Sequence, residues 1–115
     1  MRREYETLAE FSRGPFLITV DKTWEDLNPR DCFDTDNADE ICQKIHDGTY
    51  DWFMLRVRAF FDGHELGSSY LGGCCYEDAR DVLTDGTAEN FIEEAIKEAR
   101  VAVGSLKEKL AQLEI

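Results

Sequence analysis

Residues 50–76 constrain the fold of this chain more than any other segment, because they have the sequence of one long β-hairpin. A run of β-branched and aromatic residues precedes Asp62-Gly63, and a second extended run follows it. Asp-Gly between two such runs predicts a two-residue type I′ turn. The turn sets the expected register, in which four pairs face each other: Phe61 and His64, Ala59 and Leu66, Val57 and Ser68, Leu55 and Tyr70.

In that register one face of the hairpin is mostly apolar. The other face carries Arg56, Arg58, Phe60, Glu65, Ser69 and Leu71. Glu65 lies diagonal to Arg58, so we expect an ion pair between them.

The segments around the hairpin predict one further strand and several short helices. Residues 16–20 are rich in β-formers and predict a third strand beside the hairpin. Residues near 3–12 indicate a short helix that ends at Gly14-Pro15. Thr23 could cap a single turn, and Asp36-Asn37 offers an N-cap for a helix at 38–46. The apolar side of that helix would be a buried stripe of Ile41, Cys42 and Ile45, and a further short helix is expected near 77–83.

The last helix, expected at 88–113 with Thr87 as its cap, has two halves of different character. Its apolar residues recur at alternating steps of four and three, as in a coiled-coil seam: Ile92, Ile96, Ala99, Val103, Leu106, Leu110 and Leu113. Such a helix measures about 39 Å, which exceeds the width of a three-stranded sheet. The first half therefore covers the sheet, and the exposed seam of Leu106, Leu110 and Leu113 predicts a homodimer about a two-fold axis. The alternative is that the whole helix packs inside its own monomer.

Length and charge limit the classes of protein to which this chain can belong. The 115 residues suit a single domain, 1–115, that buries a core without a metal or disulfide. The net charge is −12, and residues 21–51 hold ten acidic and three basic residues. Such a field repels nucleic acid and anionic lipid and favours basic partners, although acidity can also serve solubility alone.

The sequence gives no sign of a membrane or secreted protein. No apolar run is long enough to span a bilayer, and the N-terminus lacks the apolar core of a signal peptide, so we expect a cytoplasmic location. The four cysteines show no CxxC spacing and are interpreted as small apolar residues in a reducing compartment: Cys32, Cys42, Cys74 and Cys75.

Catalytic and metal-binding patterns are incomplete. His46 follows Cys42 at helical spacing, which is half of a metal site, but no second pair follows. The acidic residues at 34–40 lack the glycine and the closing glutamate of a calcium loop. Gly72-Gly73 indicates a bulge rather than a phosphate loop. A nucleophilic Cys74 or Cys75 would need a histidine that nothing in the sequence brings close. We therefore predict no enzyme activity, no metal and no cofactor.

The segment ELGSSYLGGCCYED at 65–78, with the strand before it and the acidic helix after it, resembles small, mostly uncharacterised proteins encoded by bacteriophages and mobile elements. In these proteins a hairpin bearing ELGS and a YLGGCCYE-like segment precedes a C-terminal helix. The resemblance covers about half of the chain and implies a phage or prophage setting. By analogy of size and acidity, it is compatible with anti-CRISPR proteins and other inhibitors of host defence.

We therefore expect an α+β fold, with a three-stranded antiparallel sheet near 16–20, 51–61 and 64–75 packed against the long C-terminal helix. The function expected from the sequence is occupation of a basic nucleic-acid-binding surface on a host protein or nucleoprotein complex, without direct binding of nucleic acid. The carboxylates expected to replace phosphates are Asp34, Asp36, Asp39, Glu40, Glu89 and Glu93. The alternative is a homodimeric structural or regulatory phage protein whose acidity serves only solubility.

Overall fold

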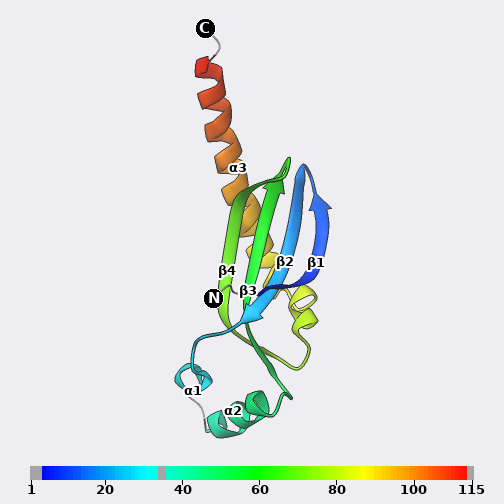
Figure 1. Cartoon of the computed structure of the whole chain (residues 1–115), viewed down its shortest axis with the longest axis vertical. Helices are drawn as coiled ribbons and strands as arrows, with labels where there is room; N and C mark the ends of the chain where they lie inside the picture. The colour runs from blue at the N-terminus through cyan, green and yellow to red at the C-terminus, as the bar shows by residue number, and fades with distance from the viewer. Residues whose placement is uncertain (1–3, 34–35, 114–115) are drawn as a thin grey trace.

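The computed structural model describes residues 4–33 and 36–113 and has an antiparallel sheet packed against a long helix (Figure 1). The elements in chain order are β1 (Glu6–Arg13), β2 (Phe16–Trp24), α1 (Pro29–Cys32), α2 (Ala38–His46), β3 (Asp51–Phe61), β4 (His64–Tyr76), the 3₁₀ helix η1 (Ala79–Leu83) and α3 (Thr87–Leu113). The strand order is β1-β2-β3-β4. The α+β class and the long C-terminal helix are confirmed, but within the described residues the sheet has four strands rather than three.

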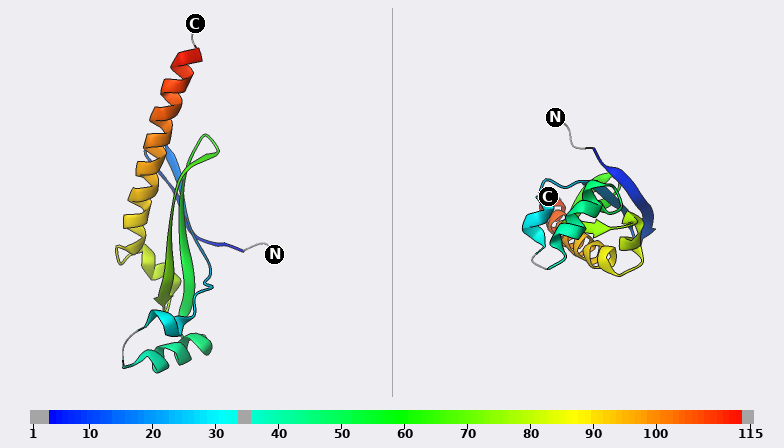
Figure 2. Two further views of the ribbon diagram at one scale, coloured as in Figure 1. Left: turned by 90° about the vertical axis from the view of Figure 1, so that its left-hand side faces the viewer. Right: turned by 90° about the horizontal axis from the view of Figure 1, so that it is seen from below.

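The molecule is elongated, with extents of 65 × 28 × 23 Å. Figure 2 shows α3 against one face of the sheet, with its C-terminal half projecting past the strands. Helices α1 and α2 lie at the opposite end of the molecule. The two ends of the long axis are therefore formed by different segments of the chain.

The fourth strand is β1, and it corrects the expectation of a helix near 3–12. Gly14-Pro15 is a hairpin turn rather than a helix stop, with Gly14 at φ +57° in the first central position. The register pairs Phe11 with Ile18 and Arg13 with Phe16. Local helix propensity is overridden because this pairing satisfies the backbone of β2 and adds Ala9 and Phe11 to the core.

The central hairpin confirms the predicted turn and corrects part of the register. Asp62 and Gly63 both have positive φ, 50° and 79°, as a type I′ turn requires. Phe61 pairs with His64 as expected, and Arg58 forms an ion pair with Glu65 at 3.7 Å. A bulge after Glu65 then shifts the remaining pairs by one, so the observed pairs are Ala59 with Gly67, Val57 with Ser69 and Leu55 with Leu71.

The shift puts Gly67 under α3. A Cβ at this position would lie 2.0 Å from the backbone oxygen of Ala95 and 2.9 Å from the backbone nitrogen of Ala99. Only glycine allows this approach, so the contact with the helix favours the bulged register. Ser69 and Leu71 consequently lie on the face of the sheet that α3 covers, whereas the predicted register puts them on the opposite face. Tyr70 and Ser68 take their places beside the arginines.

The predicted bulge at Gly72-Gly73 is also present, between the pairs of Phe53 with Cys74 and Leu55 with Leu71. Gly73 has φ +71°, which favours glycine. Its freed N–H donates to the Glu25 carboxylate at 2.8 Å, so the bulge links β4 to the segment that follows β2.

The core lies between the sheet and the first half of α3. Ile18, Val20, Leu55 and Val57 are fully buried, and the helix contributes Ile92, Ala95, Ile96 and Ala99. Beyond the end of the strands the apolar seam of α3 no longer contributes to the core, and Leu106, Leu110 and Leu113 are exposed. The division of α3 into a covering half and a projecting half is therefore confirmed.

The shorter helices agree with the sequence in position more than in packing. Helix α2 has the predicted bounds, but none of its residues is buried, so Ile41, Cys42 and Ile45 are only half covered. Thr23 lies inside β2 and caps no turn; Asn28 caps α1 instead, accepting from the Arg30 N–H. No helix within the described residues is long and apolar enough to span a membrane.

Candidate partner-binding site

The predicted acidic residues at the start of α2 are exposed, as a surface for a basic partner requires. Asp36, Asp39 and Glu40 are solvent-accessible, and Asp34 lies outside the described residues. Asp39 forms an ion pair with Arg30, and Glu40 forms one with Lys44 at 3.4 Å. Because both pairs are largely exposed, they contribute little to stability and can exchange for another cation.

The other two predicted carboxylates, Glu89 and Glu93, are not brought together with this group. They lie near the start of α3, which packs against one face of the sheet, whereas α2 lies beyond the ends of the strands (Figures 1 and 2). The Glu89 carboxylate pairs with Arg13 at 2.5 Å, and Glu93 lines a groove with Arg13, Lys97 and Arg100. These two glutamates therefore lie among basic side chains, on a surface separate from the carboxylates of α2.

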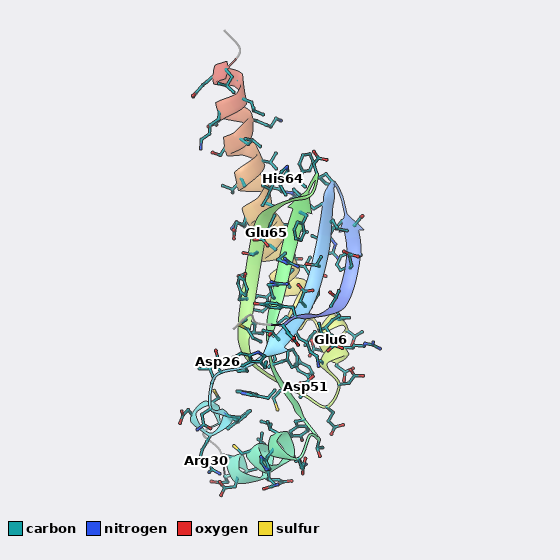
Figure 3. All side chains as sticks on the ribbon, viewed as in Figure 1. Glu6, Asp26, Arg30, Asp51, His64 and Glu65 are labelled. Atoms are coloured by element: carbon teal, nitrogen blue, oxygen red, sulfur yellow. The ribbon has the colours of Figure 1, made fainter. Side chains whose placement is uncertain are left out.

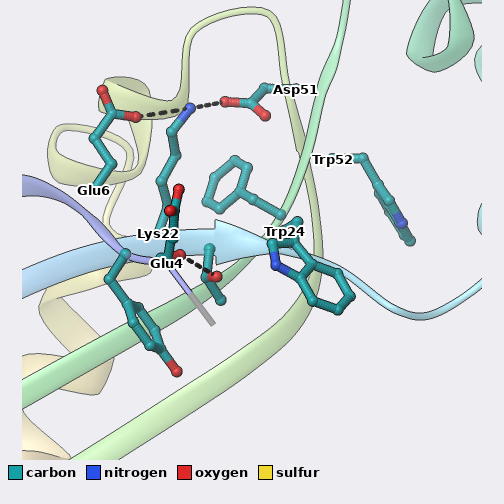
Figure 4. Close-up of a pocket in the computed structure, with 9 residues that line it drawn as sticks. Glu4, Glu6, Lys22, Trp24, Asp51 and Trp52 are labelled. Carbon is teal, nitrogen blue, oxygen red and sulfur yellow. Dashed lines mark hydrogen bonds and ion pairs between the residues drawn. The ribbon is translucent and has the colours of Figure 1, made fainter. Parts of the chain in front are cut away.

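A pocket at the base of the sheet adds carboxylates that the sequence did not single out (Figure 4). This basal pocket has a volume of about 340 Å³ and is lined by Glu4, Tyr5, Glu6, Lys22, Thr23, Trp24, Asp51, Trp52 and Phe53. Three of these residues are acidic, one is basic and four are aromatic. In Figure 3, Glu6, Asp26 and Asp51 lie where the sheet meets the α1–α2 segment, so the pocket opens beside the acidic end of the molecule.

Strand pairing holds the walls of the basal pocket. Trp24 ends β2, where it pairs with Phe53 of β3, and Glu6 begins β1 opposite Lys22. The Thr23 hydroxyl donates to the backbone oxygen of Glu4, which ties the chain before β1 to the edge of the pocket.

Trp52 is fixed from the other side of the pocket. Its indole N–H donates to the Leu27 carbonyl at 3.0 Å, and its ring lies 5.7 Å from that of Phe33. The pocket is thus joined to the α1–α2 segment through a tryptophan that contacts both.

Lys22 shows which charge this environment favours. Its ammonium pairs with Asp51, lies 3.3 Å from Glu6 Oε2 and is 5.9 Å from the centre of the Phe53 ring. Burial by itself lowers the pKa of Lys22, but the hydrogen bonds and charges of Asp51 and Glu6 outweigh it, and the net pKa is raised. The pocket therefore stabilises a positive charge, and among its described lining residues three carboxylates outnumber the one ammonium.

A buried ionic network on the open face of the sheet keeps the N-terminal wall in place. Asp21 is 1% exposed and accepts from Arg56 Nε at 3.1 Å and Nη2 at 2.9 Å, from Arg58 at 3.3 Å and from the Thr7 hydroxyl at 3.1 Å. The Tyr5 ring, which lines the basal pocket, stacks on Arg56 at 3.4 Å. The two arginines are thus engaged by Asp21 and by aromatic rings.

The cysteines and histidines are spread over the chain. Cys74 is buried, and burial raises the pKa of its thiol to about 11, so it is a neutral core residue at physiological pH. Cys42 and Cys75 are half-buried, and Cys32 is exposed, so only Cys74 has the burial expected of a small apolar residue in the core. His46 and His64 are both exposed. Within residues 4–33 and 36–113, no three side chains of the metal-binding types converge.

The projecting half of α3 forms a separate exposed surface. We call Val103 to Leu113 the helix tip. Leu106, Leu110 and Leu113 are 49%, 52% and 75% exposed. Lys107 and Lys109 flank this leucine row, so the tip is apolar with basic borders in an otherwise acidic protein.

Comparisons with protein-family models, with curated proteins and with solved structures found no match to this chain.

Proposed function

We propose that this chain is a binding protein, not an enzyme, whose acidic end takes up the basic surface of a partner protein. In this proposal Asp34, Asp36, Asp39 and Glu40 occupy positions that nucleic-acid phosphates would otherwise take. The basal pocket holds one lysine or arginine side chain of the partner between its aromatic rings and carboxylates. In the phage setting implied by the sequence resemblance, the partner is a nucleic-acid-binding component of a host defence complex, which the chain inhibits.

The single observation that carries this proposal is the environment of Lys22. The basal pocket already holds one ammonium against carboxylates and an aromatic ring, and it raises the pKa of that ammonium. Carboxylates beside aromatic faces are the usual means by which proteins bind cationic side chains. Because the lining residues that the structure describes keep an excess of negative charge, the pocket favours a second cation from a partner.

The first experiment identifies the partner and tests the charge dependence. A pull-down from a bacterial lysate, analysed by mass spectrometry, supplies the candidate, and the affinity is then measured over a series of salt concentrations. We expect binding to weaken steeply with salt, since the attraction is screened. Reversing Asp34, Asp36, Asp39 and Glu40 together should abolish binding while the circular dichroism spectrum is unchanged.

A control chain reversed at exposed acidic positions elsewhere, Glu10, Glu98 and Glu108, should bind nearly as the unmodified protein does. To test the pocket directly, calorimetric titration with an arginine-rich peptide should give weaker binding for Trp24→Ala than for the unmodified chain. Binding that is insensitive both to salt and to the four-residue reversal would exclude the phosphate-mimic mechanism.

Self-association is the second candidate function, and the exposure of the helix tip favours it. Leaving a leucine in water that could be fully buried costs about 1.5–3 kcal/mol. In this version the chain is a homodimeric structural or regulatory phage protein, and its acidity serves only solubility. Equilibrium sedimentation of the unmodified protein tests it, with a mass above 13.2 kDa at micromolar concentration as the expected result.

A further inference from the structure

A second groove lies between α2 and the base of the sheet. This α2 groove has a volume of about 510 Å³ and is lined by Phe33, Asn37, Ile41, Tyr50, Cys75, Tyr76, Glu77 and Asp81. Phe33, Ile41 and Cys75 contribute apolar atoms to its lining, beside the polar groups of Asn37 and Tyr50, and no residue of α2 is buried. Glu77 and Asp81 are exposed and give the groove an acidic border. The groove thus combines incompletely covered apolar side chains with negative charge.

The helix tip has the complementary properties at the other end of the molecule. It presents Leu106, Leu110 and Leu113 with the basic borders of Lys107 and Lys109. From residue 97 to residue 113 the chain holds four basic and two acidic residues, whereas residues 21–51 hold ten acidic and three basic ones. An amphipathic helix with basic borders is the kind of ligand that a groove with apolar side chains and an acidic border accommodates.

We propose that the helix tip of one copy docks in the α2 groove of a second copy, so that the chain associates head to tail. The leucines contact the apolar groups of Phe33, Ile41 and Tyr50, and the basic borders of the tip lie beside Glu77 and Asp81. This inference rests on the second candidate function, self-association, and names the surface that receives the helix tip. It does not depend on the basal pocket, because the two sites share no residue.

The geometry excludes docking within one copy and favours a groove over a second tip. The helix tip and α2 lie at opposite ends of a molecule 65 Å long (Figures 1 and 2). Among the described residues the exposed seam runs only from Leu106 to Leu113, about one heptad, whereas coiled coils are recognised over about three or more. A tip that enters a preformed groove buries its leucines without needing a longer seam. Such a contact joins two different surfaces, so it can continue from copy to copy.

The test uses two variants that each remove one surface. Leu106→Glu/Leu110→Glu disables the tip, and Ile41→Glu disables the groove. Each variant alone should sediment at 13.2 kDa at concentrations where the unmodified protein forms larger species. An equimolar mixture of the two should recover a dimer, because it still offers one intact tip and one intact groove. Val101→Glu is the control: this residue is 68% exposed on α3 but lies off the leucine row, so association should persist.

Charge reversal provides a second measurement with substitutions that do not touch the core. Glu77→Lys/Asp81→Lys and Lys107→Glu/Lys109→Glu should each weaken association at least tenfold, and a chain that carries both pairs should regain it. Pairing of tip with tip would leave the groove variant associated and the mixture unrecovered, which would overturn the docking proposal while self-association stands. An unmodified protein that stays monomeric throughout would overturn both.

Discussion

The sheet body and the α1–α2 end of this molecule are held together in different ways. The sheet body, which comprises the four strands and the first half of α3, contains fully buried apolar residues on both of its layers. In the α1–α2 end, residues 25–33 and 36–50, no described residue is buried. Packing therefore constrains the choice of residues in the body, whereas the α1–α2 end can carry many charged residues. The surfaces assigned to partners lie at or beside that end, apart from the helix tip.

Large losses of stability are expected in the body, and the first is at Gly67. Gly67→Ala places a Cβ 2.0 Å from the Ala95 oxygen, so α3 must move away from the sheet. We expect a loss of about 3 kcal/mol or more in the free energy of unfolding. Gly104→Ala is the matched control, since nothing lies within 4 Å of its added Cβ on the projecting half of α3. It should stabilise the helix by about 0.5–1 kcal/mol. Urea denaturation of both variants gives the two values.

Replacing one aspartate in each region compares the two regions directly. Asp21→Ala in the body leaves Arg56 and Arg58 without the buried carboxylate that both contact, so we expect a loss of about 3–5 kcal/mol. Asp39→Ala at the α1–α2 end removes an exposed ion pair with Arg30, and the expected loss is about 0.5 kcal/mol or less. Equal losses at the two positions, measured by urea denaturation, would contradict the proposed difference between the regions.

The sequence predicts those parts of the fold that local chemistry determines. Asp62-Gly63 specifies its turn because both positions need positive φ, and the apolar spacing of α3 shows where the helix leaves the sheet. The register of β4 beyond Glu65 could not be read in the same way. It depends on how closely α3 approaches Gly67, and that contact joins residues distant in the chain.

The candidate site likewise has one part that local sequence predicts and one part that depends on contacts between distant residues. The exposed carboxylates at the start of α2 follow from local charge and the helix cap. The basal pocket does not, because Glu4 and Glu6 reach Lys22 and Trp24 only when β1 pairs with β2. Residues 3–12 have a helical composition, which concealed that pairing. In the sequence, the signal for the basal pocket is that Trp24 and Trp52 each stand next to acidic residues.

The smallest expected effect concerns acid, and it tests whether the two regions unfold together. A hydrogen bond from the Tyr76 hydroxyl at 2.5 Å, followed by one from the Thr87 N–H at 2.8 Å, lowers the pKa of Asp85 at the start of α3. These bonds show that Asp85, and not Thr87, satisfies the first N–H of the helix. At the other end, bonds from the Thr49 side chain and backbone lower the pKa of Asp47, next to α2.

Each group therefore stabilises the folded state above the ordinary pKa of 3.8, and this contribution is lost as the pH falls through the lower folded value. Asn at either position keeps an acceptor but removes the titration. We expect Asp85→Asn to reduce the acid dependence of the urea midpoint between pH 7 and about pH 3. Asp47→Asn should leave that midpoint unchanged if the α1–α2 end opens independently of the body, since its titration then affects only local opening. A shift for Asp47→Asn as large as that for Asp85→Asn would show instead that the α1–α2 end unfolds as one unit with the sheet body.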